Sequence, residues 1–579
     1  MDQKELDAKI SEYLQFEEHP HFVNDLQQVV DNKNSEELND RFYMDLEFGT
    51  GGLRGVIGGG YNRMNPYIIR KSTTGLANYI NKTTDKGSVA IAYDSRNFSE
   101  LFAEEAALIL CSKGIKVYLF TSLRPTPVVS YTVRKLSCTA GIVVTASHNP
   151  AEYNGYKVYW SDGGQIVPPH DVAIIEEVNA VTGKIKTMDK DQAIEQGLLI
   201  YTDKVIDEPY VDLVKSCSFR PELMRSEGKN IKVVYTPLHG AGTMLVERTL
   251  GEMGIDVITV PEQREPDGDF PTVAFPNPEI VEAMELGLKL AKKESADILL
   301  GTDPDSDRLG IAVPDGENYV LVTGNQLGVL LGDYIFFSLK EKGELNSKNA
   351  FVKTIVTTEL QRLVAEYYGV KSYDVLTGFK YIAEKIKEFE KTGEKYIFGG
   401  EESYGFLVTD EVRDKDAVSA AFLTVELTLY HRSKGKSVLD RLKEIWEKFG
   451  YFEELLISRY LKGEKGKAQM EGMMSSIRTS PPSMFGGIPL SFMKDYKTGE
   501  TFNLETGNKE KNIDLPSSNV LQFLLQDGSM VTIRPSGTEP KIKFYASCKA
   551  EPGQDLEKSR KEVSAKLKRI EEDVDEFLK

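Results

Sequence analysis

Apolar residues in the first fifty positions recur at the three-to-four-residue spacing of an amphipathic helix. The positions that set this spacing are Ile10, Tyr13, Leu14, Phe16, Phe22, Leu26, Val29 and Val30. Such spacing places apolar side chains on one side of a helix and leaves polar ones toward water. The pattern predicts a helical N-terminal arm over residues 1–47.

From residue 48 onward, short runs rich in Val and Ile alternate with longer amphipathic runs. The first such set predicts strands at 88–95, 116–120 and 141–147, with a helix at 99–114. The alternation then restarts twice, and the further strands are expected at 230–237, 256–260, 296–303, 350–356 and 395–403. Helices are expected from Asn325 and over 437–450. This alternation is typical of α/β domains with parallel sheets.

The C-terminal region has a different pattern. Asp527-Gly528 separates two alternating runs within 521–536, which predicts a β-hairpin, and 541–547 predicts another strand. A closing helix carries an apolar stripe at Leu556, Val563, Leu567, Ile570, Val574 and Leu578. We therefore expect three similar α/β domains and a smaller α+β domain. With charged linkers near 221–229 and 341–349 as boundaries, the predicted divisions are 1–47, 48–225, 226–346, 347–450 and 451–579.

Composition narrows the possible partners. The chain has 579 residues, with 71 Lys and Arg against 89 Asp and Glu, so its net charge is −18. This charge repels nucleic acid and anionic membrane surfaces, so we expect neither as a partner. An anionic ligand would need local cations or a metal ion.

The four cysteines, Cys111, Cys138, Cys217 and Cys548, are scattered without metal-ligand or disulfide spacing. The N-terminus MDQKELDAKI lacks the basic and apolar segments of a signal peptide, and no uncharged apolar run approaches the ~18–20 residues of a membrane span. The sequence predicts a cytoplasmic protein.

The hexapeptide TASHNP, Thr145–Pro150, follows an apolar run. A strand ending here would place Ser147 at the carboxyl edge of its sheet, where open α/β folds bind ligands. A serine hydrolase is disfavoured, because Gly-x-Ser-x-Gly is absent and the adjacent His148 is not expected to orient as a base for Ser147. The hexapeptide alone fits a functional loop and a polar turn equally well.

The segment GTDPDSDR, Gly301–Arg308, also follows an apolar run. Asp303, Asp305 and Asp307 alternate, so an extended loop lets three carboxylates converge on one hard cation. Without an ion, their mutual repulsion should raise their pKa values. An EF-hand is excluded, because its sixth position is not Gly and its twelfth is not Glu. A solvated acidic turn is less favoured than a Mg²⁺ site.

Two further loops offer polar groups. In GGEESYG, Gly399–Gly405, paired acids beside Ser403 suit hydroxyl groups of a sugar; a glycosidase pair is disfavoured because adjacent residues point to opposite faces. In RPSGTEPKIK, Arg534–Lys543, an Arg, two hydroxyls and a Gly suit a phosphate group, although a basic hairpin end without a ligand stays possible. No Walker A or GxGxxG motif is present. Together the four loops indicate phosphoryl transfer to or from a phosphosugar in an interdomain cleft.

The motifs TASHNP, GTDPDSDR, GEESYG and RPSGTEP, in this order, resemble those of the α-D-phosphohexomutases. The resemblance extends from about Phe48 to the C-terminus. It implies four domains around a central cleft, the first three sharing an α/β topology. The N-terminal arm and TPLHGAG (Thr236–Gly242) are more similar to the phosphoglucomutase/phosphopentomutase branch than to phosphomannomutases.

The resemblance implies a role for each matching residue. Ser147 would carry the phosphoryl group, and Asp303, Asp305 and Asp307 would bind Mg²⁺ together with an oxygen of that group. The predicted catalytic set is Ser147, Lys157 as the acid/base group, His148, and the cleft arginines Arg54 and Arg308. The sugar would contact Glu401, Ser403, Thr377 and Gly378. The non-transferring phosphate would contact Arg534, Ser536, Gly537, Thr538 and Lys543.

The implied reaction interconverts glucose 1-phosphate and glucose 6-phosphate through glucose 1,6-bisphosphate, which also serves as primer. The partner would be a small phosphosugar, and the chain a monomer or weak homodimer. Phosphopentomutase and phosphomannomutase activities stay open on the same scaffold. From other classes, a haloacid-dehalogenase-like phosphotransferase with Asp303 as nucleophile is disfavoured by Asp307 and by its mid-chain position. A non-catalytic sugar-phosphate sensor is disfavoured by the intact Ser147 and aspartates.

Overall fold

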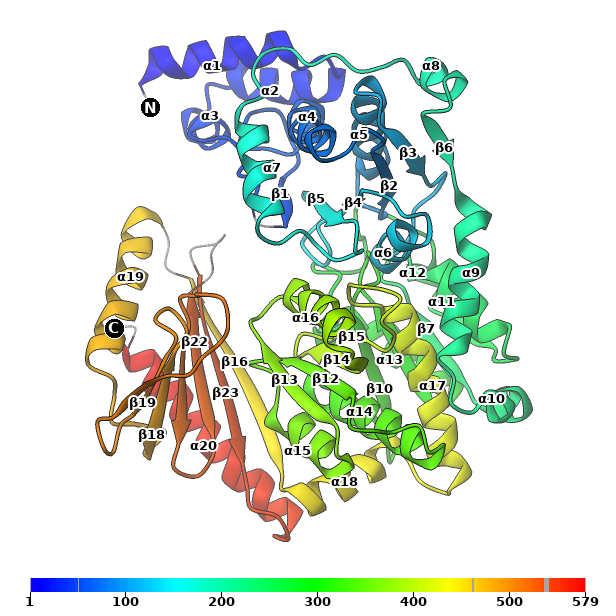
Figure 1. Ribbon diagram of the computed structural model, residues 1–579, viewed down its shortest axis with the longest axis vertical. Coiled ribbons are helices and arrows are strands. Elements are labelled where there is room, and N and C mark those ends of the chain that lie inside the picture. The colour runs from blue at the N-terminus through cyan, green and yellow to red at the C-terminus, as the bar shows by residue number, and fades with distance from the viewer. Residues whose placement is uncertain (1, 50, 461–462, 536–540, 578–579) are drawn as a thin grey trace. The chain divides into compact units, whose positions relative to one another are not determined.

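A computed structural model describes residues 2–49, 51–460, 463–535 and 541–577. The chain divides into two compact units (Figure 1). Unit 1 comprises residues 1–324 and 379–434, and unit 2 comprises 325–378 and 435–579. The chain therefore passes from one unit to the other at 324/325, 378/379 and 434/435.

The N-terminal arm is helical, as its periodicity predicts, and it is part of the first hydrophobic core. Its helices are α1 (Gln3–Phe16), α2 (Pro20–Asp31) and α3 (Ser35–Phe42). Tyr13 is fully buried and makes edge-on ring contacts with Phe42, Tyr61 and Tyr67. Tyr61 follows the first strand of the α/β layer and Tyr67 lies in its first helix, so one core spans the arm and this layer.

The first sheet of unit 1 has the strand order β1-β5-β4-β2-β3-β6. Its strands are β1 (Gly52–Val56), β2 (Ser88–Tyr93), β3 (Lys116–Leu119), β4 (Ala140–Val144), β5 (Tyr153–Trp160) and β6 (Leu199–Tyr201). Strands β4, β2, β3 and β6 run parallel, whereas β5 runs antiparallel to β4 and β1. The helices of this region are α4 (Pro66–Thr83), α5 (Ser99–Ser112), α6 (Thr126–Lys135), α7 (His170–Asn179), α8 (Lys190–Glu195) and α9 (Asp203–Ser216). The three strands and the helix predicted here are confirmed, but β4 ends at Val144, so Ser147 lies beyond the strand.

The second sheet of unit 1 has the order β11-β10-β9-β7-β8. Its strands are β7 (Val233–Thr236), β8 (Val257–Thr259), β9 (Ile298–Thr302), β10 (Leu309–Asp315) and β11 (Asn318–Val322). The parallel strands β8, β7 and β9 confirm the second predicted set. The accompanying helices are α10 (Pro221–Glu227), α11 (Thr243–Gly251), α12 (Pro261–Arg264) and α13 (Val281–Glu294), with a 3₁₀ turn at Gly228–Asn230.

The third predicted set is distributed over both units. Unit 1 holds α16 (Phe379–Thr392), the antiparallel pair β14 (Lys395–Glu401) and β15 (Gly405–Leu407), and α17 (Ala417–Ser433). Unit 2 holds the parallel pair β12 (Asn349–Thr354) and β13 (Lys371–Val375) with α15 (Glu359–Tyr368) and α18 (Val438–Phe449). Helix α14 (Gly324–Glu341) begins at the boundary between the units.

The C-terminal sheet of unit 2 follows the path β16-β23-β22-β21-β18-β19-β20. Its strands are β16 (Phe452–Tyr460), β17 (Met484–Phe485), β18 (Ile488–Asp495), β19 (Glu500–Asn503), β20 (Lys509–Lys511), β21 (Leu521–Leu525), β22 (Met530–Pro535) and β23 (Lys541–Lys549). The β21–β22 pair confirms the predicted hairpin. Besides α19 (Gly463–Thr479), helix α20 (Leu556–Phe577) packs on β16 and β23, and it buries Val563, Leu567, Ile570 and Val574 of the predicted stripe. Leu578 lies outside the described residues.

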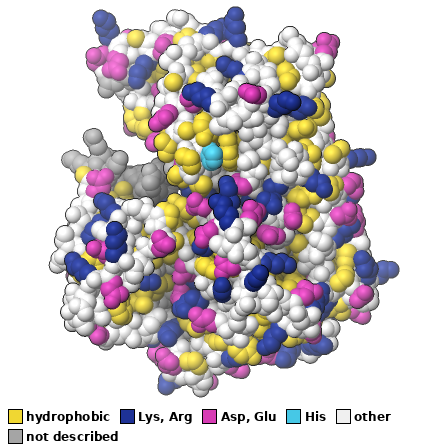
Figure 2. Space-filling view, viewed as in Figure 1, with side chains coloured by type: hydrophobic (Ala, Val, Ile, Leu, Met, Phe, Trp, Pro, Cys, Tyr) yellow, Lys and Arg dark blue, Asp and Glu magenta, His cyan; other side chains and the backbone are white. Residues whose placement is uncertain are grey.

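Acidic and basic side chains are interspersed over the face in Figure 2 and do not form one field of a single sign. No helix in the described part of the chain is both long and apolar enough to cross a membrane.

Candidate active site

The turn after β4 holds Ser147 in an unusual backbone conformation. Ser147 has φ +53° and is 3% exposed. Its backbone N–H donates to Thr145 Oγ1 at 2.8 Å, and the Thr145 hydroxyl in turn donates to Asp94 Oδ2 at 2.5 Å. Asp94 directly follows β2, so the carboxyl ends of two neighbouring parallel strands fix this turn together.

Arg96 binds the same turn through its guanidinium group. The group donates to the carbonyl oxygens of Ser147 at 2.6 Å, Pro150 at 2.7 Å and Tyr153 at 3.0 Å, and also to that of Asn149. Arg96 is 2% exposed, so these charge-assisted bonds form away from water. The left-handed turn at Ser147 is therefore fixed on both sides of the serine.

The structure contradicts the expectation that His148 does not orient toward Ser147. Its Nδ1 lies 3.1 Å from Ser147 Oγ, within hydrogen-bonding distance. Adjacent side chains point apart on an extended strand, but the positive φ of Ser147 turns the two toward each other. Burial and the cations Arg308 and Arg54 hold the pKa of His148 well below its usual range, so the imidazole is neutral.

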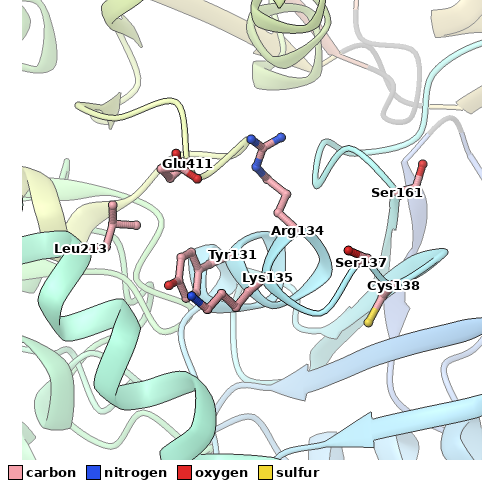
Figure 3. A pocket seen from close by; sticks show the side chains of 8 residues that line it. All are labelled: Tyr131, Arg134, Lys135, Ser137, Cys138, Ser161, Leu213 and Glu411. Atoms are coloured by element: carbon pink, nitrogen blue, oxygen red, sulfur yellow. The ribbon is translucent and has the colours of Figure 1, made fainter.

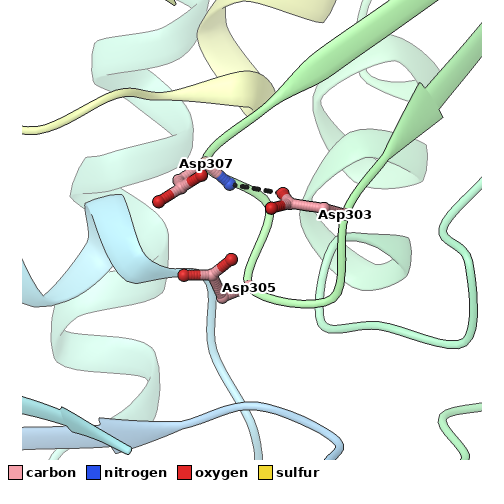
Figure 4. A group of neighbouring side chains, drawn as sticks. All are labelled: Asp303, Asp305 and Asp307. Carbon is pink, nitrogen blue, oxygen red and sulfur yellow. Dashed lines mark hydrogen bonds between the residues drawn. The ribbon is translucent and has the colours of Figure 1, made fainter. Parts of the chain in front are cut away.

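The loop between β9 and β10 brings three carboxylates together, as the spacing predicts. Asp303, Asp305 and Asp307 are buried, and one ligand atom from each lies within 4.8 Å of the others. Figure 4 shows the carboxylates directed toward a common space, with the backbone N–H of Asp307 donating to Asp303 Oδ1 at 3.1 Å. Asp303 Oδ2 accepts a hydrogen bond from Ser147 Oγ at 2.9 Å, which joins this loop to the serine turn.

These three residues fit a hard divalent cation. Asp305 Oδ1 and Asp307 Oδ1 are buried and have no hydrogen-bond partner among the described residues. Buried carboxylate oxygens without a partner carry a high free-energy cost, which a cation removes. A set made of carboxylate oxygens alone suits Mg²⁺ or Ca²⁺ and not a soft metal.

The pKa values of Asp303 and Asp307 shift in opposite directions, which corrects the expectation that repulsion raises the pKa throughout this loop. Burial and the charges of Asp305 and Asp307 raise the pKa of Asp303 well above its usual range. Burial would raise the pKa of Asp307 as well, but Lys415, Lys157 and Arg308 together lower it far below that range. Burial, reinforced by repulsion among the carboxylates, therefore prevails at Asp303, whereas neighbouring cations prevail at Asp307.

Two lysines supply most of that positive charge. Lys157 Nζ, from β5, lies 2.7 Å from Asp305 Oδ2 and 3.1 Å from Asp307 Oδ2. Lys415 Nζ lies 3.1 Å from Asp307 Oδ2 and 2.9 Å from Asp414 Oδ1. The predicted acid/base residue Lys157 thus contacts the loop that carries Asp303, Asp305 and Asp307. We call this loop the metal loop after the Mg²⁺ site that the sequence predicts there. Lys415 is a second cation beside it.

A glycine brings the strand of Lys157 close to β1. Gly52 pairs with Lys157 across the two strands and has φ +129°. A Cβ at Gly52 would lie 1.8 Å from the carbonyl oxygen of Tyr156, so no other residue fits without moving β1. Two residues further along β1, Arg54 Nη1 donates to Asn149 Oδ1 at 3.2 Å, which places this predicted cleft arginine at the serine turn.

Arg308 and Glu401 complete the part of the site in unit 1. The backbone N–H of Arg308 donates to Asp303 Oδ1 at 3.0 Å, and its guanidinium pairs with Glu279. Glu401, at the end of β14, is 9% exposed, and its charge acts on both Arg308 and Lys415. Ser403 follows in the short turn between β14 and β15 and is half-buried.

The TPLHGAG segment packs directly against the metal loop. The Ala241 N–H donates to the carbonyl oxygen of Pro304 at 2.7 Å. A Cβ at Gly240 would lie 2.4 Å from Pro304 Cα, and one at Gly242 would lie 2.6 Å from Ser306 Oγ. The glycines therefore permit the close approach that supports the three aspartates.

Unit 2 contains the remaining predicted contacts. Arg534 on β22 and Lys543 on β23 are direct cross-strand partners, so two cations lie side by side. Thr377 and Gly378 follow β13, and Gly378 has φ +119°. Ser536, Gly537 and Thr538 lie outside the described residues.

Sequence reasoning missed four supporting residues: Asp94, Arg96, Thr126 and Lys415. Thr126, at the first position of α6, donates from Oγ1 to Asp305 Oδ2 at 2.7 Å and from its backbone N–H to the Asp305 carbonyl at 2.8 Å. The Asp-Ser-Arg sequence that directly follows the β2 run was a usable signal for Asp94 and Arg96. Lys415 and Thr126 have no local pattern that marks them.

Comparison with known families agrees with this geometry. Models described as phosphoglucomutase/phosphomannomutase α/β/α domains I, II and III match residues 45–184, 208–316 and 323–449, and that of the C-terminal domain matches 495–566. The chain belongs to the phosphoglucomutase/phosphomannomutase family. The expected set of three α/β domains and a C-terminal domain is thereby confirmed.

Curated members of this family cover nearly the whole chain. A phosphoglucomutase of Staphylococcus saprophyticus is 36% identical over 525 residues, covering 90% of this chain and 93% of its own. One of Staphylococcus aureus is 36% identical over 526 residues, with 90% and 92% covered.

Solved structures of the family share the fold. Parafusin, a phosphoglucomutase from Paramecium in an open form, aligns with a TM-score of 0.69 at 17% identity, covering 93% of this chain and 94% of its own. A phosphoglucomutase/phosphomannomutase family protein of Burkholderia thailandensis aligns with a TM-score of 0.64 at 18% identity, covering 92% and 96%.

Proposed function

We propose that this protein is a phosphoglucomutase that interconverts glucose 1-phosphate and glucose 6-phosphate. The hydrogen bond from Ser147 Oγ to Asp303 Oδ2 carries the proposal, because it joins a serine nucleophile to a set of carboxylates suited to a cation. The curated relatives that match about nine-tenths of the chain are named phosphoglucomutases. That naming favours glucose over mannose phosphates.

The first half-reaction transfers the phosphoryl group of phosphorylated Ser147 to the O6 hydroxyl of glucose 1-phosphate. The bond from phosphorus to Ser147 Oγ breaks, a bond to O6 forms, and the O6 proton passes by way of an acid/base group to Ser147 Oγ, which leaves as a hydroxyl. Lys157 and Lys415, which pair with Asp305 and Asp307, would supply positive charge to the transferred group, as would Arg308, whose backbone N–H binds Asp303. Mg²⁺ held by Asp303, Asp305 and Asp307 would neutralise charge on the transferred group.

The second half-reaction regenerates the phosphoserine. Glucose 1,6-bisphosphate turns end for end, and Ser147 Oγ takes the phosphoryl group from O1, which leaves glucose 6-phosphate. His148, neutral and 3.1 Å from Ser147 Oγ, would accept the serine proton in this step once the hydroxyl turns from Asp303 Oδ2 toward Nδ1. Lys157, as acid/base group, would donate a proton to the leaving O1, and the proton taken up by His148 would restore Lys157 to its ammonium form.

The remaining residues would bind the sugar and its second phosphate. Glu401 and Ser403 would accept and donate hydrogen bonds to ring hydroxyls, with Thr377 and Gly378 contacting either orientation of the sugar. The phosphate that is not transferred would contact Arg534 and Lys543, whose cross-strand pairing supports a bidentate cationic site. The predicted contacts of Ser536, Gly537 and Thr538 belong to this same phosphate.

A transfer through Asp303 as nucleophile is the weaker candidate. Asp303 Oδ1 accepts backbone N–H groups of Asp307 and Arg308, and Oδ2 accepts the Ser147 hydroxyl. Both oxygens are therefore engaged in holding the loop together. Mapping the stable phosphate by peptide mass spectrometry separates the two candidates, because phosphate on an aspartate would contradict the serine assignment.

Substrate choice is tested with a panel of glucose, mannose, ribose and N-acetylglucosamine 1-phosphates, each with its bisphosphate primer. We expect the highest kcat/KM for glucose 1-phosphate, and loss of at least about a thousandfold in Ser147→Ala. Thr182→Ala, which removes an exposed hydroxyl of the same unit, is the matched control. A higher kcat/KM for ribose 1-phosphate would reassign the protein as a phosphopentomutase.

The other expectations from the sequence remain proposals with direct tests. We expect a monomer or weak homodimer in the cytoplasm, to be checked by sedimentation and fractionation. The predicted divisions 48–225, 226–346, 347–450 and 451–579 are to be checked by limited proteolysis. We expect cleavage close to the positions where one division ends and the next begins.

A further inference from the structure

Unit 1 contains a cavity that involves none of the predicted catalytic or binding residues. Its volume is about 700 Å³, and its polar lining comes from Tyr131, Arg134, Lys135, Ser137, Ser161 and Glu411. Figure 3 shows Arg134 and Glu411 on one side of the space and Tyr131 and Lys135 on the other. The volume lies in the range of about 300–1,000 Å³ that is usual for small-molecule sites.

The cavity is locally cationic in a chain whose net charge is −18. Arg134 and Lys135 contribute two positive charges against the one carboxylate of Glu411. Arg134 Nη1 donates to the carbonyl oxygen of Asp162 at 3.3 Å. Its Nε is buried and has no hydrogen-bond partner among the described residues. A buried guanidinium N–H without an acceptor is costly, and an anion in the cavity would supply one.

A second guanidinium, that of Arg413, lies near Arg134, and the carboxylate of Glu390 offsets its charge. Arg413 is 2% exposed, and its Nη1 is likewise buried without a partner in the part of the chain that the structure describes. Arg413 and Arg134 share one carboxylate, since Glu390 Oε1 lies 2.5 Å from the former and 3.8 Å from the latter. Burial and the nearby charge of Arg413 lower the pKa of Arg134.

The position of Arg134 and Lys135 in the last turn of α6 does not account for this arrangement. Cations there stabilise the negative end of a helix by about 0.3–1 kcal/mol, mainly through the last carbonyl groups. The hydrogen bond described for Arg134 goes to Asp162, outside the helix. The guanidinium therefore binds outside the helix, and Arg134 also lines the cavity.

We propose that this cavity is a second ligand site, which binds the phosphoryl group of a small phosphorylated metabolite. Arg134 and Lys135 would bind the phosphoryl oxygens with the hydroxyls of Ser137 and Ser161. Glu411 would accept hydrogen bonds from hydroxyl groups on the carbon skeleton.

Two walls of the cavity lead directly to the metal loop. Helix α6 carries Arg134 at one end, and at the other end Thr126 binds Asp305 through two hydrogen bonds. The second wall begins at Glu411. Two residues on, the backbone N–H of Arg413 donates to Ser130 Oγ of α6 at 2.8 Å.

The same segment then reaches the cation site itself, because Lys415 Nζ lies 3.1 Å from Asp307 Oδ2. A ligand that shifts α6 or the 411–415 segment therefore moves groups bonded to Asp305 and Asp307. Occupancy of the cavity and Mg²⁺ affinity should be coupled, and by linkage each must alter the other equally.

Binding is tested by isothermal titration of the Ser147→Ala/Arg534→Ala protein, in which phosphate binding at the catalytic centre is weakened. The probes are inorganic phosphate and glycerol 3-phosphate. We expect adding Arg134→Gln or Lys135→Glu to weaken binding of both probes roughly ten- to a hundredfold. Lys135 is exposed, so its substitution leaves the fold intact. Lys186→Gln, an exposed lysine of unit 1, should change nothing.

The two probes separate a metabolite site from a site for free phosphate. Glycerol 3-phosphate should bind more tightly than inorganic phosphate, and Glu411→Gln should remove that advantage. Equal affinity in Lys135→Glu and Lys186→Gln would overturn the site. Tighter binding of inorganic phosphate would overturn the metabolite assignment.

The coupling is tested on the otherwise unmodified enzyme through its Mg²⁺ activation curve. Saturating glycerol 3-phosphate should shift the apparent Mg²⁺ constant by about fivefold or more, and Lys135→Glu should abolish the shift. An unchanged constant with the ligand bound would overturn the coupling. The outcome is independent of which sugar phosphate the enzyme prefers, because the constant concerns only the cation.

Discussion

Ser147 Oγ donates a 2.9 Å hydrogen bond to Asp303 Oδ2, although the two residues are 156 positions apart in the chain. The bond joins the turn after β4 to the loop after β9, and both lie in unit 1. Serine and carboxylates are therefore brought together by the folding of one unit. This preorganisation is what transfer through a fixed serine requires, since positioning contributes much of the rate enhancement.

Replacing Asp305 by Asn should weaken Mg²⁺ binding at least about tenfold. The amide keeps an acceptor for Thr126 but loses a negative charge that faces the cation. The apparent constant is read from activation curves and from equilibrium dialysis. Excess EDTA should abolish activity, and added Mg²⁺ should restore it. The control is Asp191→Asn, which changes an exposed carboxylate of unit 1. Full activity of the wild type in excess EDTA would exclude a metal requirement.

Arg534→Ala should lower kcat/KM by one to two decades. It removes a charge-assisted contact with phosphate of roughly 1.5–3 kcal/mol. Phosphorylation of Ser147 and Mg²⁺ binding should stay close to wild type, because those groups lie in unit 1. Lys511→Ala on β20 of the same sheet is the control. Wild-type steady-state kinetics in Arg534→Ala would remove this residue from the phosphate site.

Arg96→Lys should lower kcat about tenfold or more with little change in KM. Lysine keeps the charge but cannot hold four carbonyl groups of the serine turn at once, so Ser147 loses its fixed geometry. Steady-state kinetics and the rate of Ser147 phosphorylation report the effect, with circular dichroism as the check on folding. A rise in KM at constant kcat would instead indicate a role in sugar binding.

Glu454→Gln should stabilise the protein above about pH 7 and have little effect near pH 5. Burial raises the pKa of Glu454, on β16, to about 7, although hydrogen bonds from Thr358 and Ser547 oppose the rise. The folded state then binds more protons than the unfolded state between the two pKa values. Protonated Glu454 therefore contributes to the free energy of unfolding at low pH. This contribution, at most roughly 3 kcal/mol, is lost as pH rises from about 4.5 to 7.

The measurement is the Tm of wild type and Glu454→Gln at pH 5, 6, 7 and 8. The Tm of the wild type should fall relative to that of Glu454→Gln as pH rises through this window, so the variant is the more stable protein at pH 8. Glu453→Gln, at the neighbouring position of β16, is the matched comparison. Parallel Tm curves for wild type and Glu454→Gln would contradict the assignment.

Local patterns predicted the strands, the hairpin and the three aspartates, because each depends on residues within one short segment. Asp303, Asp305 and Asp307 converge within the one short loop between β9 and β10, so their spacing alone was informative. Lys415 and Thr126 contact the same loop from segments that are distant in the sequence. Residue spacing within one segment cannot predict such contacts. The expectation that His148 does not orient toward Ser147 was wrong, because adjacency in sequence does not reveal the φ of +53° at Ser147 that brings the two side chains together.

The division of unit 1 into two stretches of chain has a consequence during synthesis. Asp307 emerges from the ribosome well before Lys415, whose ammonium group offsets its charge, and residues 325–378 of the other unit come between them. At a synthesis rate of roughly 5–20 residues per second, Lys415 is made on the order of 5–20 s after Asp307. During that interval the nascent acidic loop lacks one of its two lysines, so a dissolved cation is its nearest substitute, and free Mg²⁺ should speed the maturation of newly made protein.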